Sequence, residues 1–408
     1  MRIVTGVPHT FEVCGLNQVR PALPRKVQVI MGSSEFRHHS QGDPVSRIET
    51  RELQAPTLEE LRRLRASLPG EALSTPFQTP EFLHAFQETQ CADGDRTLSV
   101  VAFAADETSG RPFMLLPLLR YRRGPVRIVS IPDLNLADQT APVLSSGFLL
   151  PPAEAGALIS GFLAGIEDAD LIDIHKMHPT VQGVPNPIFA LPFGHRDGTD
   201  LQIELTETAD GTAWWKKSIY KKARSKFRRL ENEGVRFTEA GTAEDNLSIY
   251  WALAAQRKNR FRDLDRDDNL QEDGCSSFYE TLASTKGADM PFRAFALRRG
   301  TEVVGALAVL VSGTEATAVL ISIGASRWHH LSPGMVLFTK AIEWAAGHGI
   351  RHFNFGTGQQ LYKQRFGGRE LQSRRLMMPL NARGAMFVRA WEAKRTAMEL
   401  FQIALGRK

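Results

Sequence analysis

The sequence has few cysteines and no long apolar run. Its 408 residues include three cysteines, Cys14, Cys91 and Cys275, which stand far apart and form no CxxC pair. Isolated cysteines supply no disulfide framework. Nowhere do about 18 apolar residues follow one another, and the first residues contain no apolar stretch of signal-peptide length. We therefore expect a reduced, cytoplasmic protein, which could also sit peripherally at the inner membrane.

A strong excess of one charge is also lacking. Lys and Arg number 50 against 45 Asp and Glu, so the formal net charge is only +5. Any basic surface must therefore be local. Hydrophobic residues make up 42% of the chain, a composition typical of globular rather than disordered, collagenous or coiled-coil proteins. At about 150 residues per domain, the length predicts two or three domains.

Several common catalytic motifs are missing. His348 and His352 are four residues apart, but glycines interrupt the helix between them and the Glu of an H-E-x-x-H site is absent. The segment 356–361 lacks the third glycine of a dinucleotide fingerprint, and no P-loop or G-x-S-x-G occurs. These absences disfavour metal, nicotinamide, kinase and serine-hydrolase chemistry, and we expect no metal site.

The order of the expected elements predicts a mixed α/β protein with two similar halves. Residues 1–55 show no sustained periodicity and are expected to form a flexible extension. Residues 56–195 predict helices, an antiparallel meander, a helix and a late strand, and residues 196–380 repeat this order. Residues 381–408 predict an amphipathic helix with one apolar side, formed by Phe387, Trp391, Met398, Phe401 and Leu405. We expect this side to dock onto the preceding domain, and the alternative is contact with a partner or a membrane surface.

A helix start in the second half has the features of a phosphate site. The buried strand that ends at Ile323 is followed by Ser332-Pro333-Gly334 and a helix without acidic residues in its first turn. Helix N-termini offer unpaired N–H groups and partial positive charge, and Gly334 would let a phosphate approach. The alternative is that Ser332 simply caps this helix and Pro333 starts it.

The segment after the next strand resembles a known family. It contains Gly356, Gly358, Tyr362, Lys363 and Gly367 in the pattern F-G-x-G-x-x-x-Y-K-x-x-F-G. Together with the preceding Ser-Pro-Gly, this pattern is similar to the GNAT-type acetyltransferase domain of bacterial cell-envelope and polysaccharide loci, of the cellulose-biosynthesis type. More distantly it resembles the Fem peptidoglycan-bridge transferases. The resemblance covers about residues 75–380, with further support from segments 76–86, 133–144, 172–187, 214–237 and 254–261.

The resemblance implies two tandem GNAT-like domains, each a mixed, largely antiparallel sheet flanked by helices. The second would bind acetyl-CoA or another acyl-CoA between strands 315–325 and 351–355. The acceptor's amino group would attack the thioester directly and take the acyl group. The acceptor would be an amino sugar or other envelope precursor, either a small molecule or a lipid-linked saccharide. The residues implied in cofactor binding are Ser332, Pro333, Gly334, Met335, Val336, Gly356, Gly358 and Lys363.

Direct transfer needs a deprotonated amine, a stabilised oxyanion and an acid for the leaving thiolate. The resemblance implies Tyr362 as that acid, although its ring could instead pack under the loop. His329 and His330 are candidate bases because histidine titrates near neutrality, or they are surface residues. Asn354 stands where the family usually has Asp, and Thr357 where it has Arg. This departure leaves a non-catalytic scaffold of the same fold as an alternative.

The helix from Trp214 is strongly basic. Its apolar residues Trp215, Ile219, Ala223, Phe227 and Leu230 follow helical spacing and predict one buried stripe. The basic face could bind an anionic substrate, an anionic membrane surface or, in a Fem-like enzyme, aminoacyl-tRNA. It could also be merely solvated. Because no interleaved aromatics accompany it, tRNA ranks second and DNA is not expected. The predicted anion-binding set is Lys221, Lys222, Arg224, Arg228, Arg229 and Arg257.

Overall fold

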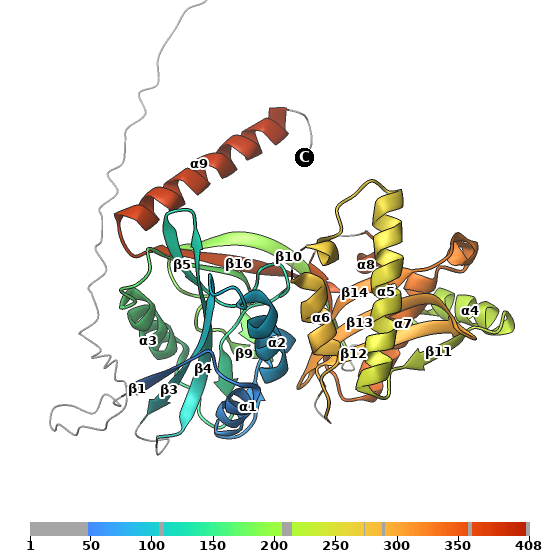
Figure 1. Cartoon of the computed structure of the whole chain (residues 1–408), viewed down its shortest axis with the longest axis horizontal. Coiled ribbons are helices and arrows are strands. Elements are labelled where there is room, and N and C mark those ends of the chain that lie inside the picture. The colour runs from blue at the N-terminus through green and yellow to red at the C-terminus, as the bar shows by residue number, and fades with distance from the viewer. Residues whose placement is uncertain are drawn as a thin grey trace, which may run out of the picture.

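Both halves of the chain contribute to one large mixed sheet. The computed structural model describes residues 48–105, 110–205, 214–272, 274–287, 290–357 and 361–404. In this part of the chain, a 14-stranded sheet has the central order β1-β3-β4-β5-β7-β16-β10-β15-β14-β13-β12-β11. The adjacent strands β16 and β10 join the halves, because β16 pairs with β7 and β10 pairs with β15. Figure 1 shows β16 and β10 running between the two halves.

The first half begins with the helices that its sequence predicts. Thr57 and Glu60 form a capping box at the start of α1, and Thr79 caps α2. The elements of this half are β1 (Ile48–Gln54), α1 (Leu58–Ala66), β2 (Ala72–Leu73), η1 (Pro76–Gln78), α2 (Pro80–Gln90), β3 (Thr97–Ala105), β4 (Pro112–Arg123), β5 (Val126–Ser130), β6 (Val143–Ser145), α3 (Pro152–Ala164), β7 (Leu171–Met177), β8 (Thr180–Val181) and β9 (Val184–Pro185).

The second half repeats the order of a meander, a helix and a parallel strand. Here β12, β13, β14, α7 and β15 follow one another as β3, β4, β5, α3 and β7 do in the first half. Its elements are β10 (Gly194–Glu204), η3 (Trp214–Lys216), α4 (Ser218–Asn232), β11 (Arg236–Glu239), α5 (Ala243–Asp263), η4 (Asn269–Gln271), α6 (Cys275–Ala283), β12 (Phe292–Arg299), β13 (Glu302–Ser312), β14 (Glu315–Ile323), η5 (Ser326–Leu331), α7 (Pro333–Gly347), β15 (His352–Thr357), α8 (Leu361–Gln364), β16 (Arg369–Pro379) and α9 (Ala382–Ala404).

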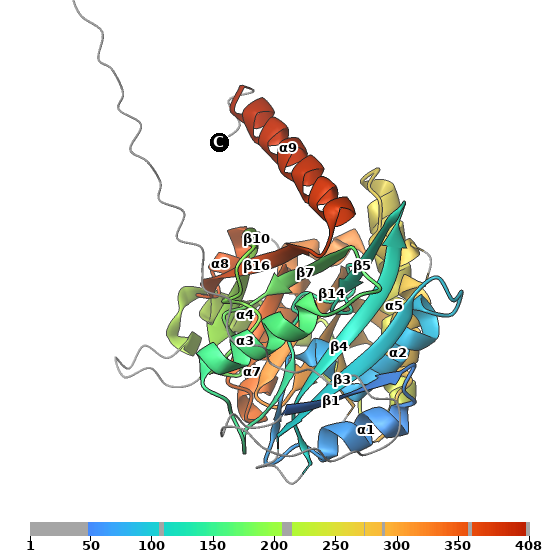
Figure 2. The same ribbon diagram turned by 90° about the vertical axis from the view of Figure 1, so that its left-hand side faces the viewer.

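Helices cover both faces of the sheet. On β12, Ala294 and Ala296 belong to the core shared by α1, α2, α5 and α6, whereas Phe295 and Leu297 face the core of α4 and α7. Because β12 is buried on both faces, its sequence is mainly an apolar run rather than an alternation of apolar and polar residues. Figure 2 shows α3, α4 and α7 on one side and α1, α2 and α5 on the other. Across the halves, the ring of Phe278 on α6 lies 5.0 Å from that of Phe82 on α2.

The predicted flexible extension, residues 1–55, is wrong at its C-terminal end. Residues 48–54 form β1, which pairs antiparallel with β3 along its whole length. Residues 1–47 lie outside the described residues. Because β1 is an edge strand, backbone hydrogen bonds to one neighbour hold it, and its polar sequence contains no apolar run that would have indicated a strand.

The predicted docking of the C-terminal helix is only partly correct. On α9, Phe387, Val388 and Trp391 pack against β5, β7 and β16. Met398 and Phe401 are 55% and 65% exposed, and both views show the helix rising away from the body. Leu405 lies outside the described residues. No helix in the described ranges is both long enough and apolar enough to span a bilayer.

A buried ion pair fastens β7 to β16 at the junction of the halves. Arg375 donates from Nε and Nη2 to the two carboxylate oxygens of Asp173, at 2.6 Å each. Their side chains are 8% and 2% exposed. Although burial alone would raise it, hydrogen bonds from Arg375 and His175 lower the pKa of Asp173 to about 2. The carboxylate is therefore ionised at neutral pH.

We expect Asp173→Asn to lower the free energy of unfolding by about 3–5 kcal/mol, because it leaves the Arg375 guanidinium buried without its counter-charge. Urea unfolding at pH 7 measures this. The matched control is Asp168→Asn, since Asp168 pairs with Arg120 at 3.3 Å but is 63% exposed. That exposed pair should contribute less than about 1 kcal/mol. Equal losses in the two variants would contradict a role for Asp173 at the junction.

Candidate active site

The candidate site lies where two neighbouring parallel strands part. β14 pairs with β13 along its length, but its pairing with β15 stops early. A bulge in the pairing with β13 also leaves Val319 without a register partner. The backbone groups of β14 that would otherwise pair with β15 therefore face a gap. The register pairs between β14 and β15 are Glu315↔His352, Ala316↔Phe353 and Thr317↔Asn354.

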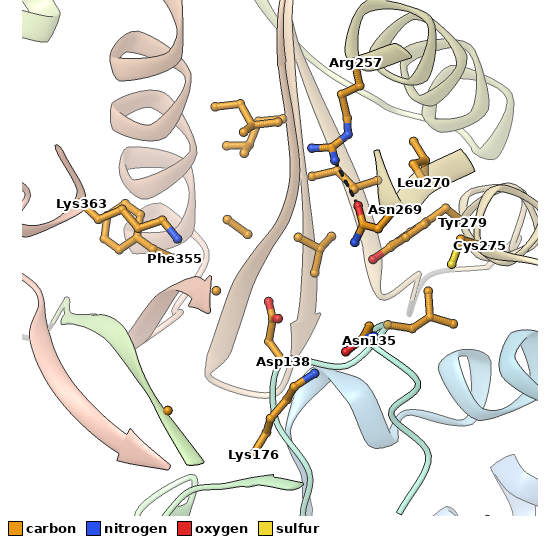
Figure 3. Close-up of a pocket in the computed structure, with 18 of the residues that line it drawn as sticks. Asn135, Asp138, Lys176, Arg257, Asn269, Leu270, Cys275, Tyr279, Phe355 and Lys363 are labelled. Atoms are coloured by element: carbon orange, nitrogen blue, oxygen red, sulfur yellow. Dashed lines mark hydrogen bonds between the residues drawn. The ribbon is translucent and has the colours of Figure 1, made fainter. Parts of the chain in front are cut away.

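A cavity of about 740 Å³ opens at this gap. This volume lies in the range of small-molecule sites. Apolar side chains of β14, α7 and β15 line one wall, among them Leu320, Ile321, Phe338 and Phe355. The first half supplies polar groups opposite, and α5, η4 and α6 supply a third side. Figure 3 shows Asp138 and Lys176 pointing into the space between Lys363 on one side and Arg257, Asn269 and Tyr279 on the other.

Gly356 marks the point where β15 turns away from β14. Its φ of +74° is in the left-handed region that favours glycine. A β-carbon there would lie 2.7 Å from Oδ2 of Asp138 and 3.0 Å from the carbonyl oxygen of Ala318. The carboxylate of Asp138, from the first half, thus occupies the space that a side chain at position 356 would need. This close approach brings the two halves together at the end of the strand pairing.

Asn354 stabilises the backbone at the same point. Its Oδ1 accepts a hydrogen bond of 2.9 Å from the backbone N–H of Gly356. Its Nδ2 is buried, with no hydrogen-bond acceptor among the described residues. The structure therefore places this predicted catalytic residue beneath the strand end, where it holds the backbone of Gly356.

Lys363 and Tyr362 lie on the short helix α8. Lys363 is buried and lines the cavity, as expected for a cofactor-site residue. Burial lowers the pKa of its ammonium group, and the charges of Asp138 and Asp200 oppose that shift. Lys363 is therefore not a solvated surface lysine. Gly358 and the side chain of Tyr362 lie outside the described residues, so the predicted acid stays a prediction.

The candidate bases His329 and His330 are exposed on η5 and do not line the cavity. Nε2 of His329 lies 3.3 Å from the carbonyl oxygen of Gly324, and Nδ1 of His330 lies 2.8 Å from that of Arg327. Both rings therefore satisfy backbone carbonyls near the start of α7. The structure does not bring either histidine to the Asp138 side of the cavity.

The predicted pyrophosphate residues, Ser332 to Val336, form the first turn of α7 just beyond the end of β14. Ser332 has a φ of +52° and its side chain makes no capping hydrogen bond, so the alternative of a Ser332 side-chain cap is wrong. A β-carbon on Gly334 would lie 3.2 Å from Cδ1 of Ile323. This turn borders the cavity wall at Ile321 without lining the cavity itself.

Of the predicted anion-binding set, only Arg257 reaches the cavity. Its Nη2 donates to Oδ1 of Asp268 at 2.7 Å and to Oδ1 of Asn269 at 3.3 Å. The other members lie on α4, which packs against α7, and none of them lines the cavity. Nη1 of Arg224 lies 3.7 Å from Oε1 of Glu343. The remaining members of the set on α4 are exposed: Lys221, Lys222, Arg228 and Arg229.

The predicted buried stripe of this basic helix is wrong at Trp215, which is 37% exposed. The α-helix begins only at Ser218, after the 3₁₀ turn η3, so the apolar phase shifts by one residue. Trp214 is buried instead, and its ring lies 5.0 Å from that of Tyr220. Lys226 on the same helix donates to the carbonyl oxygen of His330 at 2.6 Å, which places a cation beside the start of α7.

Sequence reasoning missed the polar residues that the first half, β10 and α6 contribute. Asp138, Lys176, Asp197 and Tyr279 all line the cavity. The segments 133–144 and 172–187 resembled the family, but nothing in their composition indicates that they reach a site in the other half. In the described ranges, no cluster of His, Cys, Asp and Glu could hold a metal ion.

The comparison with protein families agrees with this geometry. Residues 217–364 match the family model described as the acetyltransferase (GNAT) domain. The part of the chain that contains β14, α7 and β15 is thus similar to an N-acyltransferase domain of the GNAT type. With the repeated order of elements, this confirms the predicted fold class of two tandem GNAT-like domains with helices flanking a mixed sheet. No curated protein is significantly similar in sequence.

Several solved structures are similar to this one. FemX is 10% identical, with a TM-score of 0.52 over 80% of this chain and 97% of that chain. A conserved protein of unknown function from Bacteroides thetaiotaomicron is 11% identical, with a TM-score of 0.51 over 79% of this chain and 98% of its own. The C-terminal domain of a putative lysylphosphatidylglycerol synthetase from Agrobacterium fabrum is 13% identical, with a TM-score of 0.48, covering 81% and 93%. At these identities, the first two show a shared fold.

We expect Gly356→Ala to destabilise the protein more than Gly110→Ala. Both glycines have a φ of +74°, but a β-carbon at Gly110 meets nothing within 4 Å. The matched control should therefore cost only the left-handed strain, about 1–2 kcal/mol. Gly356→Ala adds the clash with Asp138 and Ala318, and it should also abolish ligand binding in the cavity. Urea unfolding of both variants measures the difference, and equal losses would show that Asp138 does not occupy this space.

Proposed function

We propose that the protein transfers an acyl group from acyl-CoA to an amino group of an amino sugar or other cell-envelope precursor. The acyl group that we favour is acetyl. The observation that carries this proposal is the early end of the β14–β15 pairing, which opens the cavity beside the first turn of α7. We also propose that the protein is related to envelope-polysaccharide acetyltransferases of the cellulose-biosynthesis type.

In this proposal, the donor lies in the gap with its pyrophosphate at α7 and its thioester in the cavity. The pyrophosphate would bind at the first turn of α7, where backbone N–H groups and the helix dipole favour negative charge. Lys226 lies beside this turn, and no acidic residue occurs in it. The thioester would then extend along β14 into the cavity, against Phe338 and Phe355. The donor would thus use backbone edges that in an ordinary sheet would pair with a neighbouring strand.

The chemistry would be direct attack of the amine on the thioester carbonyl. An N–H group of β14 that faces the gap would donate a hydrogen bond to the developing oxyanion. Tyr362 would protonate the leaving thiolate of CoA. The buried ammonium of Lys363 would stabilise negative charge in the cavity.

The organisation and location of the enzyme follow the same proposal. We propose a first GNAT-like domain at residues 56–195, the acyltransferase domain at residues 196–380 and the C-terminal helix at residues 381–408. The acceptor would be a small or lipid-linked saccharide. The enzyme would act in the cytoplasm, with peripheral contact at the inner membrane.

The phosphate site is tested by a variant with opposite effects on binding and stability. We expect Met335→Glu to weaken acetyl-CoA binding by at least about tenfold, because the carboxylate would repel the pyrophosphate at the helix start. Because this variant and its control Met335→Gln both lose the packing of Met335 against the core, the carboxylate should leave the free protein as stable as Met335→Gln or more stable, by about 0.3–1 kcal/mol. Isothermal titration and thermal unfolding measure the two effects.

Two controls complete this experiment. Met335→Gln should bind acetyl-CoA like the wild type, and S-acetylpantetheine, which lacks the phosphates, should not distinguish the three proteins. A wild-type protein that gives no heat with acetyl-CoA at millimolar concentration would contradict the proposed function. Equal binding by Met335→Glu and the wild type would contradict only the place of the pyrophosphate.

One observation favours a second candidate, aminoacyl transfer from tRNA. The basic residues Lys221, Lys222, Arg228 and Arg229 are exposed along α4, where they could contact a phosphate backbone. This candidate predicts tRNA retention on the immobilised protein that falls with rising salt and disappears when these four residues are changed to Gln. A charge-matched control changes the four exposed basic residues Arg62, Arg63, Arg122 and Arg123, which lie away from α4. Retention that survives in the α4 variant would contradict the candidate.

A further inference from the structure

We infer that Asp138, from the first half of the chain, binds the acceptor amine and removes its proton, so that the active site spans both halves. The inference rests on the proposed function, since it assigns the acceptor side of the same cavity. It would also give the first half a part in the reaction, although only residues 217–364 match the acetyltransferase domain.

The position of the Asp138 carboxylate carries the inference. Its Oδ2 lies 2.7 Å from the place that a β-carbon on Gly356 would take, at the end of the strand pairing, and that place lies 3.0 Å from the carbonyl oxygen of Ala318. Asp138 lines the cavity. Its charge acts on both Lys363 and Tyr279, which lie on opposite sides of the cavity. The carboxylate therefore stands between these walls, where a thioester that extends along β14 would present its carbonyl carbon.

The other acidic and histidine side chains near the cavity lie beside β7 or outside the cavity. The carboxylate of Asp197 accepts a hydrogen bond of 2.7 Å from the backbone N–H of Lys176 and lies 3.6 Å from Nδ1 of His175. His329 and His330 lie on η5, outside the cavity. Asp133, which does not line the cavity, accepts from the ammonium of Lys176 at 2.7 Å.

The reaction balances with Asp138 as the base. The acceptor arrives as an ammonium group, which the carboxylate attracts and from which it takes one proton. The amine lone pair then forms the C–N bond to the thioester carbonyl carbon, and the C–S bond breaks as the tetrahedral intermediate collapses. Tyr362 gives its proton to the thiolate, and the second amine proton leaves to solvent through the open side of the cavity. Hydroxyl and amide groups of Asn135, Thr199 and Ser373 line the same region, which suits a hydroxyl-rich amino sugar.

An acceptor-independent experiment tests the position of Asp138. In Asp138→Cys, a thiol replaces the carboxylate and should attack bound acetyl-CoA, which releases CoA and leaves an acetyl thioester at position 138. Peptide mass mapping after incubation with acetyl-CoA detects it. The matched control is Ser373→Cys, a near-isosteric change in the same cavity. Ser373 lies on β16, which is two strands from β15 in the sheet and therefore about 10 Å from it. Wild-type protein reports any acetylation of Cys275, which also lines the cavity.

The expected result is acetylation at position 138 at least tenfold above that at position 373 and at Cys275. If acetyl-CoA binds with wild-type affinity and position 138 is modified no faster than position 373, Asp138 does not face the thioester and the inference is overturned. If acetyl-CoA fails to bind wild-type protein, the proposed function fails and the inference falls with it. The two failures are thus distinguished by titration of acetyl-CoA into each variant.

A second variant tests the chemical role. Asp138→Asn keeps the shape of the side chain and removes its basicity, so release of CoA thiol with glucosamine as the probe amine should fall by at least about 100-fold in kcat/KM. The affinity for acetyl-CoA should stay within about twofold. Full transfer activity in Asp138→Asn would overturn the inference. If wild-type protein does not use glucosamine, the acetylation at position 138 decides alone.

Discussion

Backbone pairing between β14 and β15 ends after Thr317, and the rest of the proposed site depends on that interruption. Two adjacent parallel strands would normally satisfy each other's N–H and C=O groups along their length. Here the left-handed conformation of Gly356, the bulge at Val319 and the carboxylate of Asp138 keep the strands apart. The unpaired edge of β14 and the cavity beside it therefore arise from the same local geometry.

The two halves do not merely lie side by side. β16, from the end of the chain, pairs with β7 of the first half and with β10 of the second. The buried pair between Asp173 and Arg375 fastens this junction. Because the sheet is continuous, polar side chains of the first half are held rigidly against a cavity whose apolar wall belongs to the second. A site divided in this way can assign the donor to one half and the acceptor to the other.

Much of the fold could be predicted from the sequence because the signals were local. The helices, the antiparallel meander, the next helix and the late strand that were expected in each half all appear in that order. β16 was missed because its sequence, RELQSRRLMMP, mixes charges with a short apolar end. Its burial depends on partners from both halves of the chain. β1 was missed for a related reason, since an edge strand needs no apolar face.

The candidate site was predictable only where it follows a motif. Lys363 and Gly356 both belong to the glycine-rich segment, and both line the cavity. The left-handed φ of Gly356 is known only from the structure. The histidines at 329 and 330 were chosen for their chemistry, and the sequence could not show that η5 turns them towards backbone carbonyls. Asp138 had no local signal, because its importance comes from a contact with a residue more than two hundred positions later in the chain.

The most direct test of the open strand edge is hydrogen–deuterium exchange with residue resolution, in the presence and absence of acetyl-CoA. The account predicts that amides of Ala318 to Ile321 on β14, and those of the first turn of α7, become protected when the donor binds. Strands β3 and β4 should not change. Saturating acetyl-CoA that leaves the β14 amides unprotected, or that protects only the first half, would contradict the claim that the donor lies between β14 and β15.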